Sequence, residues 1–187
     1  QELKEANAYW KGKTTSELAT SYMEPETLLA MEHNIFTPGN YFYNGVGHVT
    51  VKYGEVLAIG FSGIKAKAQA ELDKLCLADG DYQKKSRFLE AVMISCDAAI
   101  EYARRYARLA LKEAEECTDP VRKRELLQIA QNCANVPEKG ATGFYEACQS
   151  FWFVQALVQI EANGHSISPG RFDQYMWPYL EADKSIS

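Results

Sequence analysis

Two of the three histidines in this chain stand in irregular segments where their imidazole groups are placed to do chemistry. His48 follows Gly47 in the stretch GNYFYNGVGHVTV, and His165 follows Gly164 at the end of a long apolar run. A glycine next to each histidine leaves room for backbone or ligand to approach closely. Imidazole titrates near neutral pH, so this pattern predicts general acid–base catalysis. For His33 we favour a satisfied structural role.

The polar residues around His165 have two interpretations. Ser166 and Ser168 can serve as cap and turn residues before Pro169, and we favour this interpretation for Ser168. Asn163 is expected to end the preceding helix rather than to contact a substrate. His48, His165 and Ser166 therefore remain as the candidate site residues.

The cysteines favour packing over chemistry. There are five, an odd number, and none forms a CxxC pair: Cys76, Cys96, Cys117, Cys133 and Cys148. This pattern disfavours a disulfide framework and a zinc site, and it is typical of a reducing, cytosolic setting. A free cysteine on a helix usually acts as a small apolar filler.

Composition and charge exclude several classes of partner. The net charge of −5 is spread over helix faces of mixed sign, without the basic stripe that phosphate backbones require, so no nucleic-acid partner is expected. The longest nearly apolar run, FWFVQALVQI, is too short to span a bilayer, and no membrane partner is expected. The 187 residues are 47% hydrophobic, which predicts one sizeable globular core.

The elements that must position the candidate residues are nearly all helices. Apolar periodicity predicts helices over about 54–77, 86–117, 119–136 and 142–163, with a final helix starting at Pro169. We expect Ser86 to cap the second helix. Asp119 should cap the third, with Pro120 at its first position, and this helix should pack antiparallel to its predecessor.

The segment from Glu32 to Leu57 is the exception to helix. Its glycines, asparagines and aromatic residues, including Tyr41, Phe42 and Tyr43, predict an ordered loop in which the aromatic rings pack. HVTVKY can add a short extended segment, but we expect no set of strands that makes a sheet. The helix over 142–163 is apolar on almost every side, which predicts burial in a body larger than this chain.

Three stretches carry a family resemblance: NGHSISPGRFDQYMWPYL, GNYFYNGVGHVTV and FYEACQSFWFVQALVQIEANGH. The chain resembles the glycyl radical enzymes of the pyruvate formate-lyase superfamily, and most closely the B12-independent glycerol and propane-1,2-diol dehydratases. The likeness covers essentially the whole chain. The separation between His48 and His165 also agrees with that of the two active-site histidines in this family.

The resemblance implies a ten-stranded α/β barrel wrapped by helices, of which this mainly α chain is a helical portion. Residues 1–187 would form a partial domain of the pyruvate formate-lyase type, truncated at both ends and without an internal boundary. The radical-carrying cysteine and the radical glycine of the family have no counterparts here. The isolated chain is therefore expected to be inactive.

The resemblance also implies a reaction. In these enzymes a thiyl radical takes a hydrogen atom from C1 of glycerol or propane-1,2-diol, water leaves from C2, and return of the hydrogen atom gives an aldehyde. By residue match, His48 would protonate the leaving hydroxyl, while His165 and Ser166 would hold the substrate hydroxyls. A small, water-poor pocket is expected around them.

Cofactor, partners and location follow from the same resemblance. It implies a protein-derived glycyl radical installed by a radical-SAM activating enzyme, without B12 and without a metal in this chain. The full protein would be a homodimeric hydro-lyase that acts on a small diol in the anaerobic bacterial cytosol or a microcompartment.

Two alternatives remain open. Another lyase chemistry on the same scaffold is the first: an arylacetate decarboxylase, a choline lyase or a formate C-acetyltransferase-like enzyme. The second is a helical module that binds partners without catalysis. A stable, monodisperse chain would favour the module, whereas exposed apolar surface would argue against it.

Overall fold

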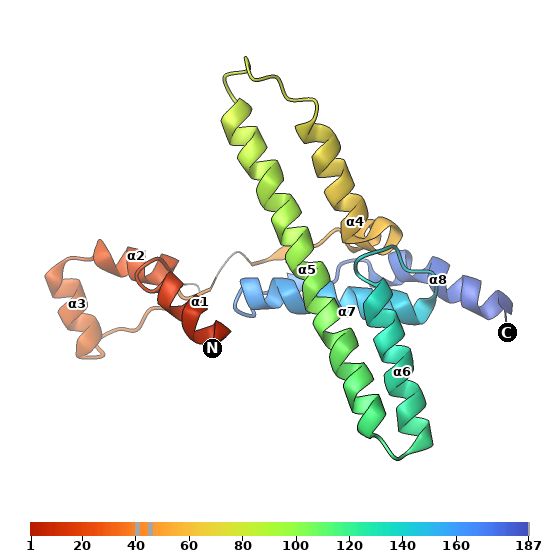
Figure 1. The fold of residues 1–187 in the computed structure, drawn as a ribbon. Coiled ribbons are helices and arrows are strands. Elements are labelled where there is room, and N and C mark those ends of the chain that lie inside the picture. Colours follow the sequence, from red (N-terminus) through yellow and green to blue (C-terminus); the bar gives the residue numbers. More distant parts are fainter. Residues whose placement is uncertain (40–41, 45–46, 187) are drawn as a thin grey trace. The chain divides into compact units, whose positions relative to one another are not determined.

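The computed structural model describes residues 1–39, 42–44 and 47–186 and consists almost entirely of helices (Figure 1). The chain divides into two compact units. The first unit comprises Gln1–Val49 and Gln159–Ile167. The second comprises Thr50–Val158 and Ser168–Ser187. The mainly α prediction is confirmed.

The first unit begins with three short helices, α1 (Glu2–Trp10), α2 (Thr15–Ser21) and α3 (Pro25–Glu32). None of the three contains a buried residue, so local contacts define them. At α2, Thr14 and Glu17 form a reciprocal capping box, which satisfies two of the unpaired N–H groups at the helix start. At α3, Pro25 occupies the first turn, where its missing N–H costs nothing.

The second unit is built around one long helix. Its helices are α4 (Tyr53–Leu72), α5 (Tyr82–Glu116), α6 (Pro120–Asn135), most of α7 (Phe144–Glu161) and α8 (Phe172–Ile186). α4 packs beside the first half of α5 and α6 beside the second half (Figure 1). The three-residue turn between α5 and α6 makes these two helices antiparallel, as predicted.

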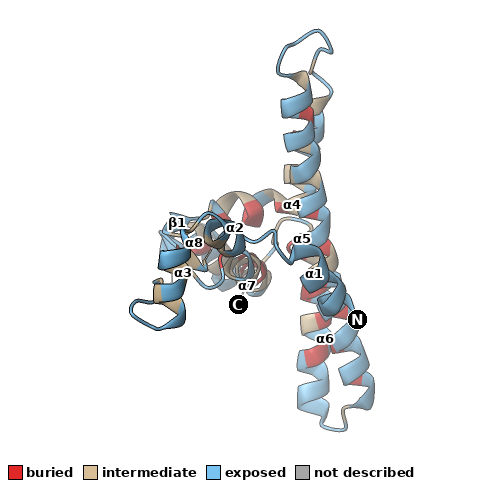
Figure 2. Ribbon diagram, turned by 90° about the vertical axis from the view of Figure 1, so that its left-hand side faces the viewer, coloured by how far each residue is buried: buried red, intermediate tan, exposed pale blue. Residues whose placement is uncertain are grey.

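Small residues on α5 allow this close packing. Ala103 and Ala107 of α5 form a buried cluster with Cys133 of α6 and Phe153 of α7. Buried positions recur along α5, while much of the remaining helix surface is exposed (Figure 2). Alanine takes up little space and favours helix, so it lets the neighbouring helices approach without destabilising α5.

A break in α4 anchors the link between α6 and α7. Gly60 has φ 64° and ψ 176°, a conformation that essentially only glycine adopts. Three backbone hydrogen bonds of 2.8, 2.9 and 2.8 Å join α4 around this break to residues 137–141. A Cβ at Gly60 would lie 2.3 Å from the carbonyl oxygen of Glu138, so a side chain here would prevent the contact.

The described residues include one pair of very short strands, β1 (Val49–Thr50) and β2 (Ile167–Ser168). The extended segment expected within HVTVKY is therefore confirmed over two residues. Its pairing with Ile167–Ser168 was not expected, because two-residue strands are too short to show the alternating pattern that marks a strand in a sequence.

The helix ends test the sequence predictions at single residues. The Asp119 side chain accepts a hydrogen bond from the Val121 N–H at 2.9 Å, which confirms the predicted cap of α6. The cap predicted at Ser86 is wrong, because α5 already begins at Tyr82. Ser86 lies inside the first turns, and its hydroxyl donates to the Gln83 carbonyl at 3.2 Å.

Helix α7 is buried on one face only. Ala147, Ser150 and Phe153 are buried, whereas Trp152 is 63% exposed and Tyr145 51% exposed. The exposed apolar face is in line with the prediction that this helix is buried in a body larger than this chain. Among the described residues, no helix has both the length and the apolarity needed to cross a membrane.

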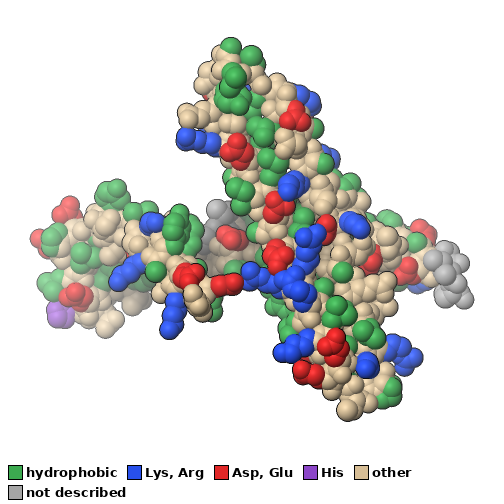
Figure 3. Space-filling view, viewed as in Figure 1, with side chains coloured by type: hydrophobic (Ala, Val, Ile, Leu, Met, Phe, Trp, Pro, Cys, Tyr) green, Lys and Arg blue, Asp and Glu red, His purple; other side chains and the backbone are tan. Residues whose placement is uncertain are grey.

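Acidic and basic side chains alternate over the surface of the second unit (Figure 3). Arg104 of α5 forms a 2.7 Å ion pair with Glu138, and Lys65 of α4 forms one of 2.7 Å with Asp97. Lys65, Asp97 and Arg104 are about half exposed, and ion pairs open to solvent in this way contribute little to stability. The charged face of α5 is a solvated surface with scattered pairs, in line with its sequence.

Candidate functional site

His48 and His165 lie side by side in the first unit. Their ring centroids are 5.0 Å apart, and the rings meet edge to face at 80°. His48 is exposed and His165 half-buried in this chain. Two groups able to transfer protons are thus brought together from segments that lie far apart in the sequence, as a two-histidine site requires.

The end of α7 turns the chain so that His165 leaves the helix axis. The Gly164 N–H donates to the Gln159 carbonyl at 2.8 Å, and the Asn163 N–H donates to the Ile160 carbonyl at 3.3 Å. These are the two hydrogen bonds of a Schellman motif, with Asn163 in the left-handed conformation at φ 50°. The prediction that Asn163 ends the helix is confirmed.

Gly47 provides the space that His165 occupies. A Cβ at Gly47 would lie 2.4 Å from the His165 carbonyl oxygen and 2.5 Å from its Nδ1. The close approach predicted for this glycine is therefore real. Gly164 serves a different purpose, because its φ of 76° requires glycine-like freedom while the space around it is open.

Left-handed backbone recurs at the site. His48 has φ 55° and Ser166 has φ 52°, although neither is glycine. This conformation costs an L-residue about 1–2 kcal/mol. Such strained positions concentrate at functional sites, where the surrounding structure holds them in place.

The segment after Ser166 forms a turn. The Ser168 hydroxyl accepts a hydrogen bond from the Gly170 N–H at 3.2 Å, which confirms the turn interpretation of this serine. The Tyr175 hydroxyl donates to the Pro169 carbonyl at 2.7 Å and ties the turn to α8. α8 itself begins at Phe172 rather than at the proline.

Sequence reasoning missed one contact beside the histidines. The Asn163 side-chain amide donates to the Asn44 side-chain oxygen at 3.1 Å. In the sequence Asn44 is one of several asparagines of the irregular loop, and no local pattern predicts a partner so far along the chain. The rings of Phe42 and Tyr43 pack edge to face at 5.1 Å, as expected of this loop, while Tyr41 lies outside the described residues.

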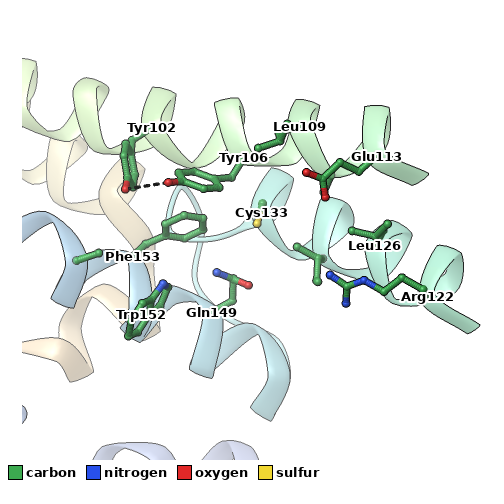
Figure 4. Close-up of a pocket in the computed structure, with 13 residues that line it drawn as sticks. Tyr102, Tyr106, Leu109, Glu113, Arg122, Leu126, Cys133, Gln149, Trp152 and Phe153 are labelled. Atoms are coloured by element: carbon green, nitrogen blue, oxygen red, sulfur yellow. Dashed lines mark hydrogen bonds between the residues drawn. The ribbon is translucent and has the colours of Figure 1, made fainter. Parts of the chain in front are cut away.

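The described residues do not enclose the water-poor pocket that was expected. His48 and Ser166 are exposed to solvent. A cavity of about 230 Å³ lies instead between α5, α6 and α7 of the second unit (Figure 4). Its lining is mostly aromatic and aliphatic, with Tyr102, Tyr106 and Phe153 at one end, and it includes none of the candidate site residues. This lining suits apolar packing better than proton transfer.

The buried cysteines have the packing role that the sequence predicts. Cys96 and Cys133 are buried, and burial raises the pKa of the Cys133 thiol to about 11. The same desolvation raises the pKa of the Cys148 thiol. These groups stay protonated at neutral pH and are poor nucleophiles. Cys76 is exposed, so the packing interpretation is wrong for that residue.

Comparison with known protein families shows to which family this chain belongs. The model of the pyruvate formate lyase-like family matches residues 1–186. The chain belongs to this family. The recognition drawn from the histidine-bearing stretches is thereby confirmed, and the helices described above are the helical portion of a glycyl radical enzyme fold.

Three similar proteins show how much of such an enzyme the chain represents. It is 40% identical over 185 residues to (2S)-3-sulfopropanediol dehydratase from Klebsiella oxytoca, covering 98% of this chain and 22% of that protein. A solved structure from work on 1,2-propanediol dehydration in Roseburia inulinivorans is 64% identical with a TM-score of 0.84, covering 98% of this chain and 22% of that one.

The glycerol-bound B12-independent glycerol dehydratase from Clostridium butyricum is 56% identical with a TM-score of 0.82, covering 99% of this chain and 24% of that one. The chain thus spans less than a quarter of the length of these relatives.

Proposed function

We propose that the full protein is a glycyl radical diol dehydratase, a hydro-lyase that converts glycerol or propane-1,2-diol into an aldehyde and water. The contact between His48 and His165 carries this proposal, because it places two proton-transferring side chains 5.0 Å apart. The similarity to a glycerol dehydratase and to a protein of propanediol dehydration supports the substrate class.

The chemistry assigned to His48 is proton donation. Hydroxide is a poor leaving group, so breaking the C2–O bond of a diol requires a proton on the departing oxygen. A protonated imidazole supplies it at neutral pH, and such general acid catalysis contributes about 10²–10⁴-fold in rate. His48 would donate this proton to the C2 hydroxyl and regain one in the next turnover.

His165 and Ser166 would orient the diol. An imidazole and a hydroxyl can each donate or accept a hydrogen bond, which matches the two hydroxyl groups of the substrate. Because the backbone at Ser166 is left-handed, the chain turns here in a way that neither a helix nor a strand allows. Since His48 and Ser166 are exposed here, other parts of the full protein would exclude water from the site.

The remaining chemistry belongs outside this chain. A protein-derived glycyl radical, installed by a radical-SAM activating enzyme, would supply hydrogen-atom abstraction at C1. The proposal includes neither B12 nor a metal. We further propose that both units belong to one domain of a homodimeric protein in the anaerobic bacterial cytosol or a microcompartment.

The test uses the full-length protein, activated anaerobically and assayed for aldehyde from glycerol and propane-1,2-diol. We expect a glycyl-type doublet by electron paramagnetic resonance. His48→Ala should lower kcat about 10²–10⁴-fold at unchanged radical yield. His33→Ala is the matched control and should leave turnover unchanged, because His33 lies at the C-terminal end of α3 and is exposed to solvent. An activated enzyme that makes no aldehyde from either diol would overturn the proposal.

A sulfonated diol is the second candidate substrate. The 40% identity to (2S)-3-sulfopropanediol dehydratase supports the same elimination on a charged substrate. Competition assays with this compound, glycerol and propane-1,2-diol would rank the three by kcat/KM. Arylacetates and choline extend the panel to decarboxylation and C–N cleavage.

The alternative of a non-catalytic interaction module is disfavoured by the surface of the chain. Trp152, Trp177 and Tyr145 are each more than half exposed on the second unit. Exposed aromatic residues of this kind promote association, so the isolated 187-residue chain should self-associate and form no product. A monodisperse, monomeric chain would favour the module.

A further inference from the structure

We infer that Asn44 and Asn163 are positioning residues for the histidine pair, an assignment that rests on the function proposed above. The Asn163 side-chain amide donates a hydrogen bond to the Asn44 side-chain oxygen at 3.1 Å. Asn44 lies shortly before His48 and Asn163 shortly before His165. The bond therefore ties together the two loops that carry the imidazoles.

The hydrogen bond between the two side-chain amides constrains how the two loops are oriented. The two loops also meet next to His48, where Gly47 lies against the carbonyl oxygen and Nδ1 of His165. The missing side chain of Gly47 allows this close approach but does not by itself fix an orientation. A hydrogen bond has a preferred distance and angle, so adding one restricts rotation of one loop against the other.

The identity of residue 163 supports this role. Glycine is the usual residue at the left-handed position after a helix, and it fills that position with least cost. Asparagine tolerates the same conformation and brings a side chain. Termination of α7 therefore requires either residue, whereas the bond to Asn44 requires the amide.

Backbone strain makes the bond consequential. His48 and Ser166 are both held in left-handed conformations, at φ 55° and 52°. Non-glycine residues keep such conformations only when surrounding contacts hold them. Without the bond between Asn44 and Asn163, the strained segments can relax and the imidazoles move away from the substrate hydroxyls.

The matched variants change the side chain and preserve the backbone. Asn163→Gly removes the amide while keeping a residue that suits φ 50°. Asn44→Ala removes the acceptor, and Asn44→Asp retains an acceptor oxygen as the conservative rescue. Asn34 is the control, since it is another left-handed asparagine, at φ 54°, and follows His33.

In the activated full-length enzyme, we expect Asn163→Gly and Asn44→Ala each to lower kcat about tenfold. The effect on KM should be smaller, and the glycyl radical yield should be unchanged. The double variant should be no worse than the more damaged single variant, because both remove the same bond. Asn44→Asp should recover much of the loss, and Asn34→Gly should match the wild type. Additive losses in the double variant would overturn the assignment.

A second measurement does not depend on turnover. Hydrogen exchange at the imidazole C2 position, followed by peptide mass spectrometry, reports each histidine separately. Exchange at His48 and His165 should speed up several-fold in Asn163→Gly and in Asn44→Ala, with His33 unchanged. Unchanged exchange would refute the positioning role. If the wild type dehydrates no diol, the proposed function fails while exchange still decides this assignment.

Discussion

Replacing Gly47 by alanine should damage the site through a displacement whose size the structure gives. The added Cβ would stand 2.4 Å from the His165 carbonyl oxygen, where ordinary contacts begin at 3.4 Å. The two segments must therefore separate by about 1 Å. The obstructing atom belongs to the backbone, so the whole segment around His165 has to move rather than one flexible side chain.

A displacement of this size is costly for catalysis. Misplacing a catalytic group by about 1 Å can reduce the rate about 10²-fold, and we expect kcat/KM for aldehyde formation to fall by this amount in Gly47→Ala. The assay is diol dehydration by the anaerobically activated full-length enzyme, normalised to glycyl radical content. Gly39→Ala is the control, because a Cβ at that glycine of the same loop meets no atom within 4 Å.

Two results would refute this reasoning. One is a Gly47→Ala enzyme whose kcat/KM stays within about twofold of the wild type. The other is an equal loss in Gly39→Ala, which would show that the loop tolerates no substitution for reasons unrelated to His165. A crystal structure of Gly47→Ala should show the wider separation directly.

Three further predictions concern the second unit. Gly60→Ala should lower the free energy of urea unfolding by about 1–3 kcal/mol, since φ 64° and ψ 176° suit only glycine. Gly80→Ala, with open space around it, should change the free energy little, and equal effects of the two substitutions would contradict this. Glu55 has a pKa lowered from 4.5 to about 2, chiefly by hydrogen bonds from two lysines. Its contribution to stability should therefore be complete above pH 4.5 and be lost as the pH falls through 2. An equally steep acid transition in Glu55→Gln would count against this prediction. At about pH 8, iodoacetamide should modify the exposed Cys76 long before the buried Cys133, whose pKa is raised to about 11. The reverse order of modification would show that the helices open readily.

The sequence predicts features that a few neighbouring residues encode. The Asp119 cap of α6 and the end of α7 at Asn163 both follow from residue preferences within one helix turn. Ser86 shows the limit of this reasoning. It has the right chemistry for a cap, but Gln83, Lys84 and Lys85 before it also favour helix, and α5 begins earlier.

Features set by distant contacts escaped prediction. The apolar pattern continues through Gly60, and a glycine inside a helix is usually tolerated, so nothing local indicates that α4 breaks there. The break exists because residues 137–141 hydrogen bond to the exposed backbone. The exposed face of α7 differs from this case, since the sequence predicts an apolar helix buried in a body larger than this chain, and Trp152 is 63% exposed here.

The candidate site combines both kinds of information. Residue type alone marks His48 and His165 as proton-transferring groups, and their adjacent glycines mark an irregular backbone. Their contact depends on Gly47, whose missing side chain admits His165, and that space becomes visible only in three dimensions. Local turns aim the imidazoles, and contacts between the two loops set their separation. Substitutions at the loop contact should therefore impair catalysis while the helices keep their stability.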